Sequence, residues 1–91
     1  MNYTRIVVKG IVQGVGYRAF IYKNAKRLPS IKGYVKNLFD GSVEIVVAGS
    51  GSDIAEMISL AKKGPLGADV REIFTEQIDL DQDFEDFAIL Y

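Results

Sequence analysis

The chain of 91 residues contains neither cysteine nor histidine. Without cysteine it cannot form a disulfide, offer a thiol nucleophile or hold a metal through sulfur ligands. The same absence fits a reducing compartment, and we therefore expect a cytoplasmic protein. Without histidine, no imidazole is available as a general acid or base.

Long apolar runs are missing as well, because charged residues and glycines interrupt the apolar stretches after a few positions. The segment after Met1–Arg5 is broken by Lys9 and Gly10, so we expect neither a signal peptide nor a membrane-spanning helix. The composition, 48% hydrophobic and 25% charged, is that of an ordinary globular domain. We expect one domain, residues 1–91, that is monomeric, has no membrane partner and buries roughly 60–65% of its unfolded surface.

Acidic residues are absent from the first 37 positions, which contain eight lysines and arginines. The rest of the chain contains three basic and twelve acidic residues, and the net charge is −1. Two interpretations are open: solvated faces of opposite sign, or a positive potential that gathers a small anion toward the first third of the chain. Because the whole molecule is mildly acidic, we expect no nucleic-acid partner.

Hydrophobic periodicity predicts the first two elements. Residues 4–12 alternate with a period of two and are rich in β-branched side chains, which predicts a strand. Over residues 17–28 the apolar side chains recur instead along one face of a helix. The polar Asn24 lies on that face, and Pro29 ends the helix.

A hairpin and a second helix are expected next. Residues 32–38 and 42–48 have the pattern of two strands, and Phe39-Asp40-Gly41 joins them. Asp-Gly between apolar alternations is the strongest short-range hairpin signal. Residues 53–63 return to the helical period, which predicts the second helix.

The ends of the second helix carry their own signals. Asp53 and Glu56, three residues apart, resemble a capping box at its start. Lys62-Lys63-Gly64-Pro65 gives the expected end: basic residues in the last turn, then glycine, then proline.

The last third of the chain completes the fold prediction. Residues 69–78 form a strand in which Val70 and Ile73 differ in parity, which indicates a bulge. Residues 87–91 alternate and form a short C-terminal strand. The order β-α-β-β-α-β predicts an α+β protein, a ferredoxin-like α/β sandwich. Four antiparallel strands plus the short C-terminal strand form its sheet, and both helices cover one face.

The segment Val12–Phe20 contains a glycine-rich loop whose ligand bears on the function of the protein. Within it, Gly14-Val15-Gly16-Tyr17-Arg18-Ala19 matches the G-x-G-x-x-A dinucleotide fingerprint. That interpretation fails because the strand after the helix runs into a hairpin, and no acidic residue precedes Asp40 to bind a ribose. A Walker loop is excluded because no Gly-Lys-Ser/Thr follows.

Two interpretations of the glycine loop remain. It can be a tight turn that needs glycine's freedom at positive φ. Alternatively, it opens onto a helix N-terminus, where free N–H groups, the helix dipole and a nest of amides favour an anion. Arg18 at the start of that helix can bind the same anion bidentately. The residues therefore predict an oxyanion, phosphate in particular, held by the amides of residues 14–18 and by Arg18.

Two motifs carry a family resemblance. "GIVQGVGYR" (Gly10 to Arg18) and "GYVKN" (Gly33 to Asn37) resemble the acylphosphatase family, whose signatures G-x-V-Q-G-V-G-[FY]-R and G-[FYW]-[AV]-[KRQ]-N are met at every position. "DGSVEIVVAG" (Asp40 to Gly49) and "KKGP" (Lys62 to Pro65) are also similar. The segment "RLPSIKG" departs from the family pattern, a difference that concerns packing rather than the motifs.

The resemblance implies an enzyme that hydrolyses acyl phosphates to a carboxylate and phosphate. It assigns Arg18 as the phosphate-binding arginine and Asn37 as the water-positioning asparagine. The remaining substrate-binding positions form the amide cradle: Gln13, Gly14, Val15, Gly16 and Tyr17. We expect the loop to leave the strand neighbouring that of Asn37, at the same end of the sheet.

The implied reaction requires few catalytic groups from the protein. An acyl phosphate is a mixed anhydride whose carboxylate departs without a proton, so no general acid is required. Phosphoryl transfer through a loose transition state depends mostly on positioning and charge stabilisation. Because the two commonest phosphoenzyme nucleophiles, cysteine and histidine, are missing, direct attack by water is the simpler path.

We expect no cofactor and no metal, and inorganic phosphate or sulfate as a product-like anion. A calcium loop at Asp79–Asp83 is not supported, because Phe84 and Leu90 occupy the positions that require Gly and Glu. The alternative function is a non-catalytic module that binds phosphate or an acyl phosphate on the same fold.

Overall fold

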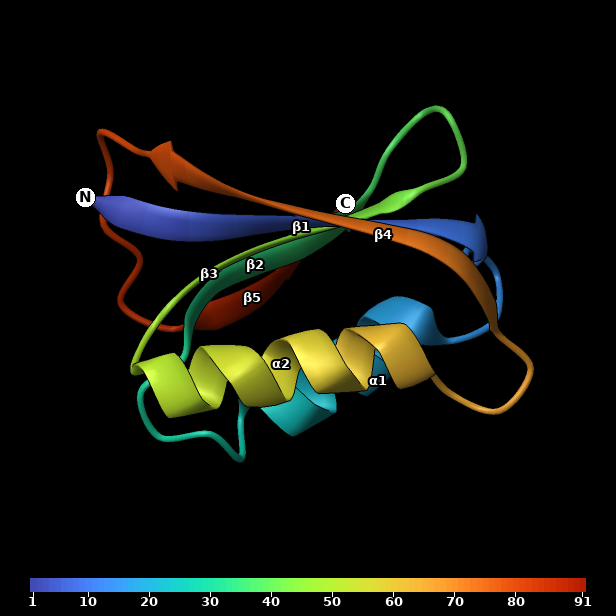
Figure 1. Ribbon diagram of the computed structural model, residues 1–91, viewed down its shortest axis with the longest axis horizontal. Coiled ribbons are helices and arrows are strands. Elements are labelled where there is room, and N and C mark those ends of the chain that lie inside the picture. Colours follow the sequence, from blue (N-terminus) through green and yellow to red (C-terminus); the bar gives the residue numbers. More distant parts are fainter.

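The computed structural model describes all residues, 1–91. The elements follow the order β1 (Asn2–Ile11), α1 (Tyr17–Ala25), β2 (Lys32–Asn37), β3 (Val43–Ala48), α2 (Gly51–Lys63), β4 (Asp69–Asp79) and β5 (Phe87–Leu90). The predicted α+β fold with a short C-terminal strand is confirmed. Both helices lie on the same face of one sheet (Figure 1). Neither helix has the length and apolar character needed to cross a bilayer.

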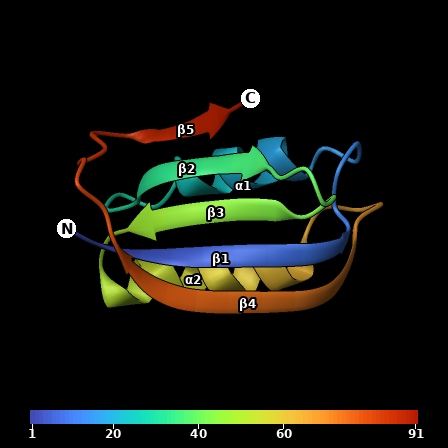
Figure 2. The ribbon, with the colours of Figure 1, turned by 90° about the horizontal axis from the view of Figure 1, so that it is seen from above.

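The sheet is mixed, with the strand order β4-β1-β3-β2-β5. The pairs β4–β1, β1–β3 and β3–β2 are antiparallel, and only the pair β2–β5 is parallel. The expectation that β1 and β2 are neighbours is wrong, because β3 lies between them (Figure 2). Both run antiparallel to β3, however, so β1 and β2 still end at the same edge of the sheet.

The predicted bulge lies in β4. Lys9 pairs with Glu72 and Gly10 with Val70, so Arg71 has no partner on β1. The extra residue lets Val70 and Ile73, which differ in parity, both pack against the core. Gly10 is required at this point, because its φ is 134° and a side chain there would collide with the Asp69 carbonyl.

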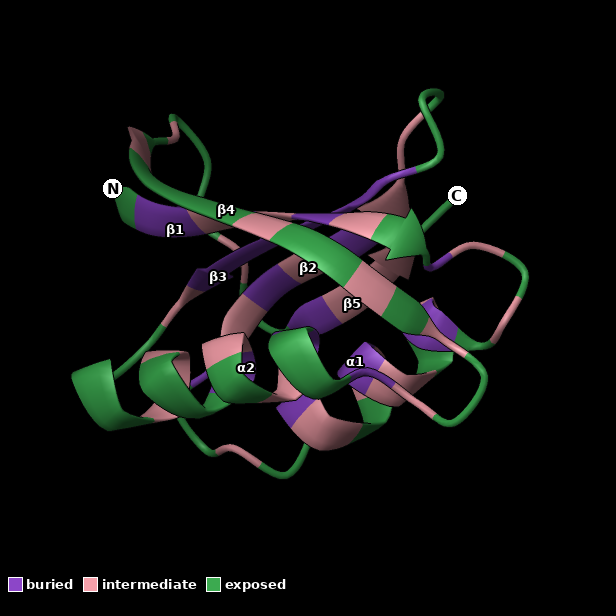
Figure 3. Cartoon of the chain, turned by 45° about the vertical axis from the view of Figure 1, so that its right-hand side comes forward, coloured by how far each residue is buried: buried purple, intermediate pink, exposed green.

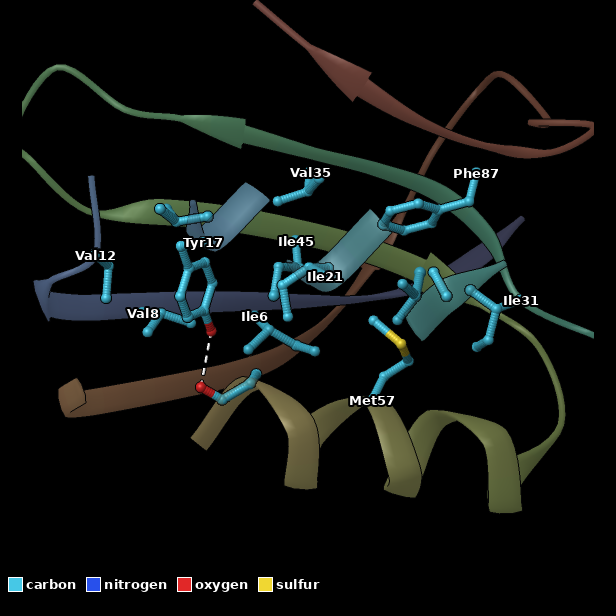
Figure 4. Packing of buried hydrophobic residues seen from close by; sticks show 14 residues of the cluster. Ile6, Val8, Val12, Tyr17, Ile21, Ile31, Val35, Ile45, Met57 and Phe87 are labelled. Carbon is cyan, nitrogen blue, oxygen red and sulfur yellow. Dashed lines mark hydrogen bonds between the residues drawn. The ribbon is translucent and has the colours of Figure 1, made fainter. Parts of the chain in front are cut away.

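The core lies between the sheet and the helices (Figures 3 and 4). It comprises Ile6, Val8, Val12, Tyr17, Ile21, Ala25, Ile31, Val35, Val43, Ile45, Val47, Met57, Ala61 and Phe87. Tyr17 links the two helices, because its hydroxyl donates to the carbonyl of Ala61 at 2.7 Å (Figure 4). Edge strand β4 contributes no fully buried residue (Figure 3).

Helix α1 ends at Ala25, three residues earlier than its periodicity predicts. The amides of Arg27 and Leu28 donate to carbonyls three residues back, so the chain tightens into a turn before Pro29. The polar Asn24 is half-buried. Its Nδ2 donates a hydrogen bond to the Phe20 carbonyl, one turn earlier in the helix, at 2.8 Å.

Helix α2 begins two residues earlier than predicted. Its N-cap is Ser50, whose Oγ accepts a hydrogen bond from the Asp53 amide. The predicted capping box of Asp53 and Glu56 is therefore wrong. Asp53 instead lies in the first turn, and Lys62 and Lys63 lie in the last turn before Gly64, as predicted.

The face of the sheet opposite the helices is partly covered by the connection 80–86, which crosses from β4 to β5 (Figure 2). Tyr3 holds this connection, since its hydroxyl donates to Asp83 and accepts from the Phe84 amide, both at 3.0 Å. On the same face the buried Glu44 accepts from Arg5 Nε at 2.5 Å and from the Tyr34 hydroxyl at 2.9 Å. Burial, together with the Glu44 carboxylate, raises the pKa of Tyr34 to about 12.

Candidate active site

The carboxyl ends of β1, β2 and β5 meet at one edge of the sheet. Because Lys36 pairs with Leu90 in parallel register, the residues that follow them, Asn37 and Tyr91, lie side by side. A pocket of about 190 Å³ opens there, lined by Val12, Gly14, Gly16, Tyr17, Arg18, Ala19, Asn37, Ile89 and Tyr91. The structure thus brings Arg18 and Asn37, predicted from separate motifs, to one cavity.

The loop before α1 lines this cavity with Gly14 and Gly16 and has main-chain donors without backbone partners. Gly14 and Gly16 have φ of 74° and 79°, a left-handed conformation that glycine adopts without strain. Gly16 occupies the N-cap position of α1, and no side chain accepts a hydrogen bond from the first amides of the helix. The first backbone hydrogen bond of the helix runs from Phe20 N to Gly16 O, and the N–H groups of residues 13–19 donate to no backbone carbonyl. These amides form the open positive end of a helix.

The side chains of Gln13 and Val15 are turned away from the pocket. Gln13 Nε2 donates to the carbonyls of Leu38 and Ser42, both at 2.8 Å, and so ties the loop to the β2–β3 hairpin. Val15 packs against the core. Of the predicted cradle, these two positions are therefore not among the residues that line the pocket.

The Tyr17 side chain is likewise structural. Its ring is buried, and its hydroxyl bonds to Ala61 rather than to the pocket. Burial raises the pKa of this phenol well above its ordinary value, so it stays neutral. The ring fixes the first turn of α1, which orients the adjoining amides.

Arg18 carries a charge that no carboxylate neutralises. Its Nη1 donates to the Leu90 carbonyl at 3.1 Å, and its guanidinium lies 4.8 Å from the centre of the Tyr91 ring. Four other basic residues of the first 37 positions do pair with acids that follow position 37: Arg5, Lys9, Lys26 and Lys32. The uneven charge distribution therefore joins segments distant in sequence. Of the basic residues left without an acidic partner, Arg18 is the one that lines this pocket.

Asn37 lines the same cavity and carries an acceptor without a partner. Its Oδ1 is buried and has no hydrogen-bond partner within the protein. A buried polar atom left in this state costs roughly 1–3 kcal/mol. The carboxamide can recover that energy by binding a polar group that enters the pocket.

Leu90 and Tyr91 are site residues that the sequence did not reveal. Their contacts with Arg18 depend on the parallel pairing of β5 with β2, which puts the end of β5 at the pocket. The only signal was the apolar alternation of residues 87–91, which predicts a strand but not its neighbour.

The tip of the β2–β3 hairpin has its own fixed geometry beside the pocket. Asp40 accepts hydrogen bonds from the side chain and the amide of Ser42, and these hold the pKa of Asp40 below its ordinary value. Lys9, 3.5 Å away, lowers that pKa further. The turn therefore keeps its shape at neutral pH.

Comparison with known proteins agrees with this geometry. The family model described as acylphosphatase matches residues 4–89. The chain belongs to the acylphosphatase family. This result confirms the resemblance seen in the two sequence motifs.

Relatives and solved structures give the same picture. The acylphosphatase of Caldivirga maquilingensis is 49% identical over 88 residues, covering 96% of this chain and 92% of that protein. The crystal structure of acylphosphatase from Bacillus subtilis superimposes with a TM-score of 0.91 at 33% identity and full coverage of both chains. The chain is also 44% identical to part of a probable carbamoyltransferase HypF of Methanocaldococcus jannaschii, covering 94% of this chain but 11% of that protein.

Family and fold together support acyl phosphate hydrolysis by this acylphosphatase chain. It is accordingly a hydrolase, and its substrate is a small-molecule acyl phosphate.

Proposed function

We propose that the 91 residues act as one catalytic domain that hydrolyses acyl phosphates by direct in-line attack of water on phosphorus. Main-chain amides of residues 13–18 and the Arg18 guanidinium hold the phosphoryl oxygens. The Asn37 carboxamide orients the water. The products are a carboxylate and inorganic phosphate.

The observation that carries this proposal is the single cavity lined by both Arg18 and Asn37, at a helix N-terminus with unpaired amides. Donors fixed before the reaction stabilise the charge that spreads over the phosphoryl oxygens. The planar fork of Arg18 suits two of those oxygens at once. The unpartnered Oδ1 of Asn37 is an acceptor for a proton of water.

No protein group needs to protonate the leaving group, because a carboxylate is a stable anion. The only phenol lining the cavity besides the exposed Tyr91 is Tyr17, whose hydroxyl is engaged with Ala61. The attacking water then loses its proton to a phosphoryl oxygen of the substrate, and the bridging P–O bond breaks as the new P–O bond forms.

The test is hydrolysis of benzoyl phosphate in water enriched in ¹⁸O. We expect enzyme-dependent loss of the ultraviolet absorbance of benzoyl phosphate, with the label in inorganic phosphate. Label in benzoate would show attack on the acyl carbon and overturn the in-line mechanism. Binding of phosphate without hydrolysis would favour the alternative, a non-catalytic module on this fold.

The likeness to a protein named as a carbamoyltransferase suggests which other substrate to assay first. Carbamoyl phosphate is also a mixed anhydride, and it should be compared with benzoyl phosphate in the same experiment.

A further inference from the structure

A second hollow lies on the face of the sheet opposite the helices, apart from the pocket that contains Arg18. Its volume is about 440 Å³, within the usual range for small-molecule sites. It is lined by Tyr34, Lys36, Leu80, Asp81, Gln82, Phe84 and Leu90, so β2, the end of β5 and the connection 80–86 form its walls. None of these residues lines the Arg18 pocket, and both hollows can therefore be filled at once.

Two aromatic residues form part of the lining, and hydrogen bonds from outside the hollow fix both of them. The ring centres of Tyr34 and Phe84 lie 5.4 Å apart. The Tyr34 hydroxyl donates to Glu44 at 2.9 Å, and the Phe84 amide donates to the Tyr3 hydroxyl at 3.0 Å. This aromatic wall is therefore preformed, and it suits a planar apolar group.

Lys36 adds a positive charge beside these rings, since its Nζ lies 6.0 Å from the centre of the Tyr34 ring. Five basic residues of the protein are half-buried, and three of them pair with carboxylates: Arg5, Lys9 and Lys32. The two without an acidic partner are Arg18, which lines the first pocket, and Lys36, which lines the second hollow. A half-buried cation without a counter-ion favours an anionic ligand.

The one acidic residue in the lining limits the charge of that ligand. Asp81 is exposed and belongs to none of the ion pairs of the protein, so its carboxylate adds a negative charge to the hollow. Asp81 would repel the second negative charge of a dianion such as a phosphate monoester, whereas a single charge can stay at Lys36. The lining thus favours a monoanion with an apolar body.

We propose that this hollow is a second binding site, separate from the catalytic pocket, and that it takes small aromatic carboxylates. The ring of the ligand packs against Tyr34 and Phe84, and the leucines of the lining add apolar surface. The carboxylate binds Lys36, which lies two residues, or roughly 6.5 Å, along β2 from Tyr34. The site requires no reaction in the first pocket, so it does not depend on the proposed function.

The experiment titrates the protein with 1-naphthoate, whose fluorescence reports binding, with and without saturating inorganic phosphate. We expect the same Kd in both cases, and amide NMR shifts at residues 34–36 and 80–84 rather than at 14–18. 1-Naphthamide, which has the same ring system without the charge, should bind about fivefold more weakly or worse. Displacement of naphthoate by phosphate, equal binding of the naphthamide, or no binding at all would overturn the site.

Two residues of the lining can be tested by substitution. Lys36→Gln should raise the Kd of naphthoate about fivefold or more, and Lys36→Arg, which keeps the charge, should restore most of the affinity. Phe84→Leu should raise the Kd about two- to tenfold, because an aromatic contact is lost while most of the apolar volume remains.

Lys23→Gln and Phe74→Leu are the matched controls. Lys23 is an exposed residue of α1 that belongs to no ion pair, and Phe74 is an exposed phenylalanine on β4, at the edge of the sheet far from β5. Neither control should change the Kd of naphthoate. An unchanged Kd in Lys36→Gln, or an equal rise in Lys23→Gln, would show that naphthoate does not bind at this hollow.

Discussion

The two helices of this protein begin in opposite ways. At the start of α2, Ser50 Oγ accepts from the Asp53 amide, and Asp53 in turn accepts from the amide and hydroxyl of Ser30. At the start of α1, Gly16 offers no side-chain cap, and the first turn contains no acidic residue. The protein satisfies one helix N-terminus itself and leaves the other unsatisfied. The difference shows where an anion from outside can replace a cap.

A glycine N-cap lowers stability by only about a few tenths of a kcal/mol relative to a Ser, Thr, Asn or Asp cap. In α1 this loss is offset by the buried ring of Tyr17, which holds the first turn against the core and against Ala61 of α2. The anchoring side chain and the open amides thus belong to the same turn. Substitutions at four positions test this contrast: three positions belong to the two helix starts, and Asn37 lines the same pocket as the start of α1.

The largest effect is expected at Arg18, which supplies the positive side chain of the open end. Arg18→Gln should lower kcat/KM for benzoyl phosphate at least about 100- to 1,000-fold, because a charged donor to the phosphoryl oxygens is lost. Arg18→Lys should also be poor, since a point charge replaces a planar fork. Near-native turnover by the lysine variant would show that bidentate binding is not needed.

Asn37→Ala should act on turnover and not on binding. We expect kcat to fall about 100-fold as the water loses its orientation, while the Kd for inorganic phosphate, measured by calorimetry, stays unchanged. Thermal stability should not fall, because the substitution removes a buried oxygen that has no partner. A parallel loss of phosphate affinity would make Asn37 a binding residue.

Gly16→Asp would give α1 an acidic cap like the first turn of α2. Space is available, since no atom lies within 4 Å of a Cβ built there. The carboxylate should weaken phosphate binding about tenfold or more by repulsion. Gly16→Ala is the control, because it carries only the left-handed backbone strain of about 1–2 kcal/mol. If both variants bind phosphate equally well, the anion does not lie at this helix start.

The smallest effect on activity is expected at the capped end. Ser50→Ala removes the side-chain acceptor of α2 and should lower the free energy of unfolding by about 1 kcal/mol. The Tm should fall by roughly 4–8 °C, with kcat/KM unchanged. Loss of activity without loss of stability would contradict the view that the start of α2 serves stability and the start of α1 serves anion binding.

Much of the fold and of the site could be predicted because the signals are local. Strand and helix periods, the Asp-Gly hairpin and the mismatch of Val70 and Ile73 each depend on neighbouring residues. The loop before Arg18 and the strand that ends at Asn37 were predicted for the same reason.

The errors concern the pairing of distant strands and one local helix start. The placement of β3 between β1 and β2 follows from the pairing of whole strands, which no single segment encodes. Ser50 was missed as a cap because three polar or small residues, Gly51, Ser52 and Asp53, separate it from Ile54, where the apolar period begins. The contacts of Leu90 and Tyr91 with Arg18 depend on the parallel pairing of β5.

The parallel edge strand has a practical consequence for anyone who produces this protein. Because β5 runs alongside β2, any purification tag fused after Tyr91 would emerge beside Arg18. A tag fused before Met1 would emerge at the opposite end of the sheet, where β1 begins.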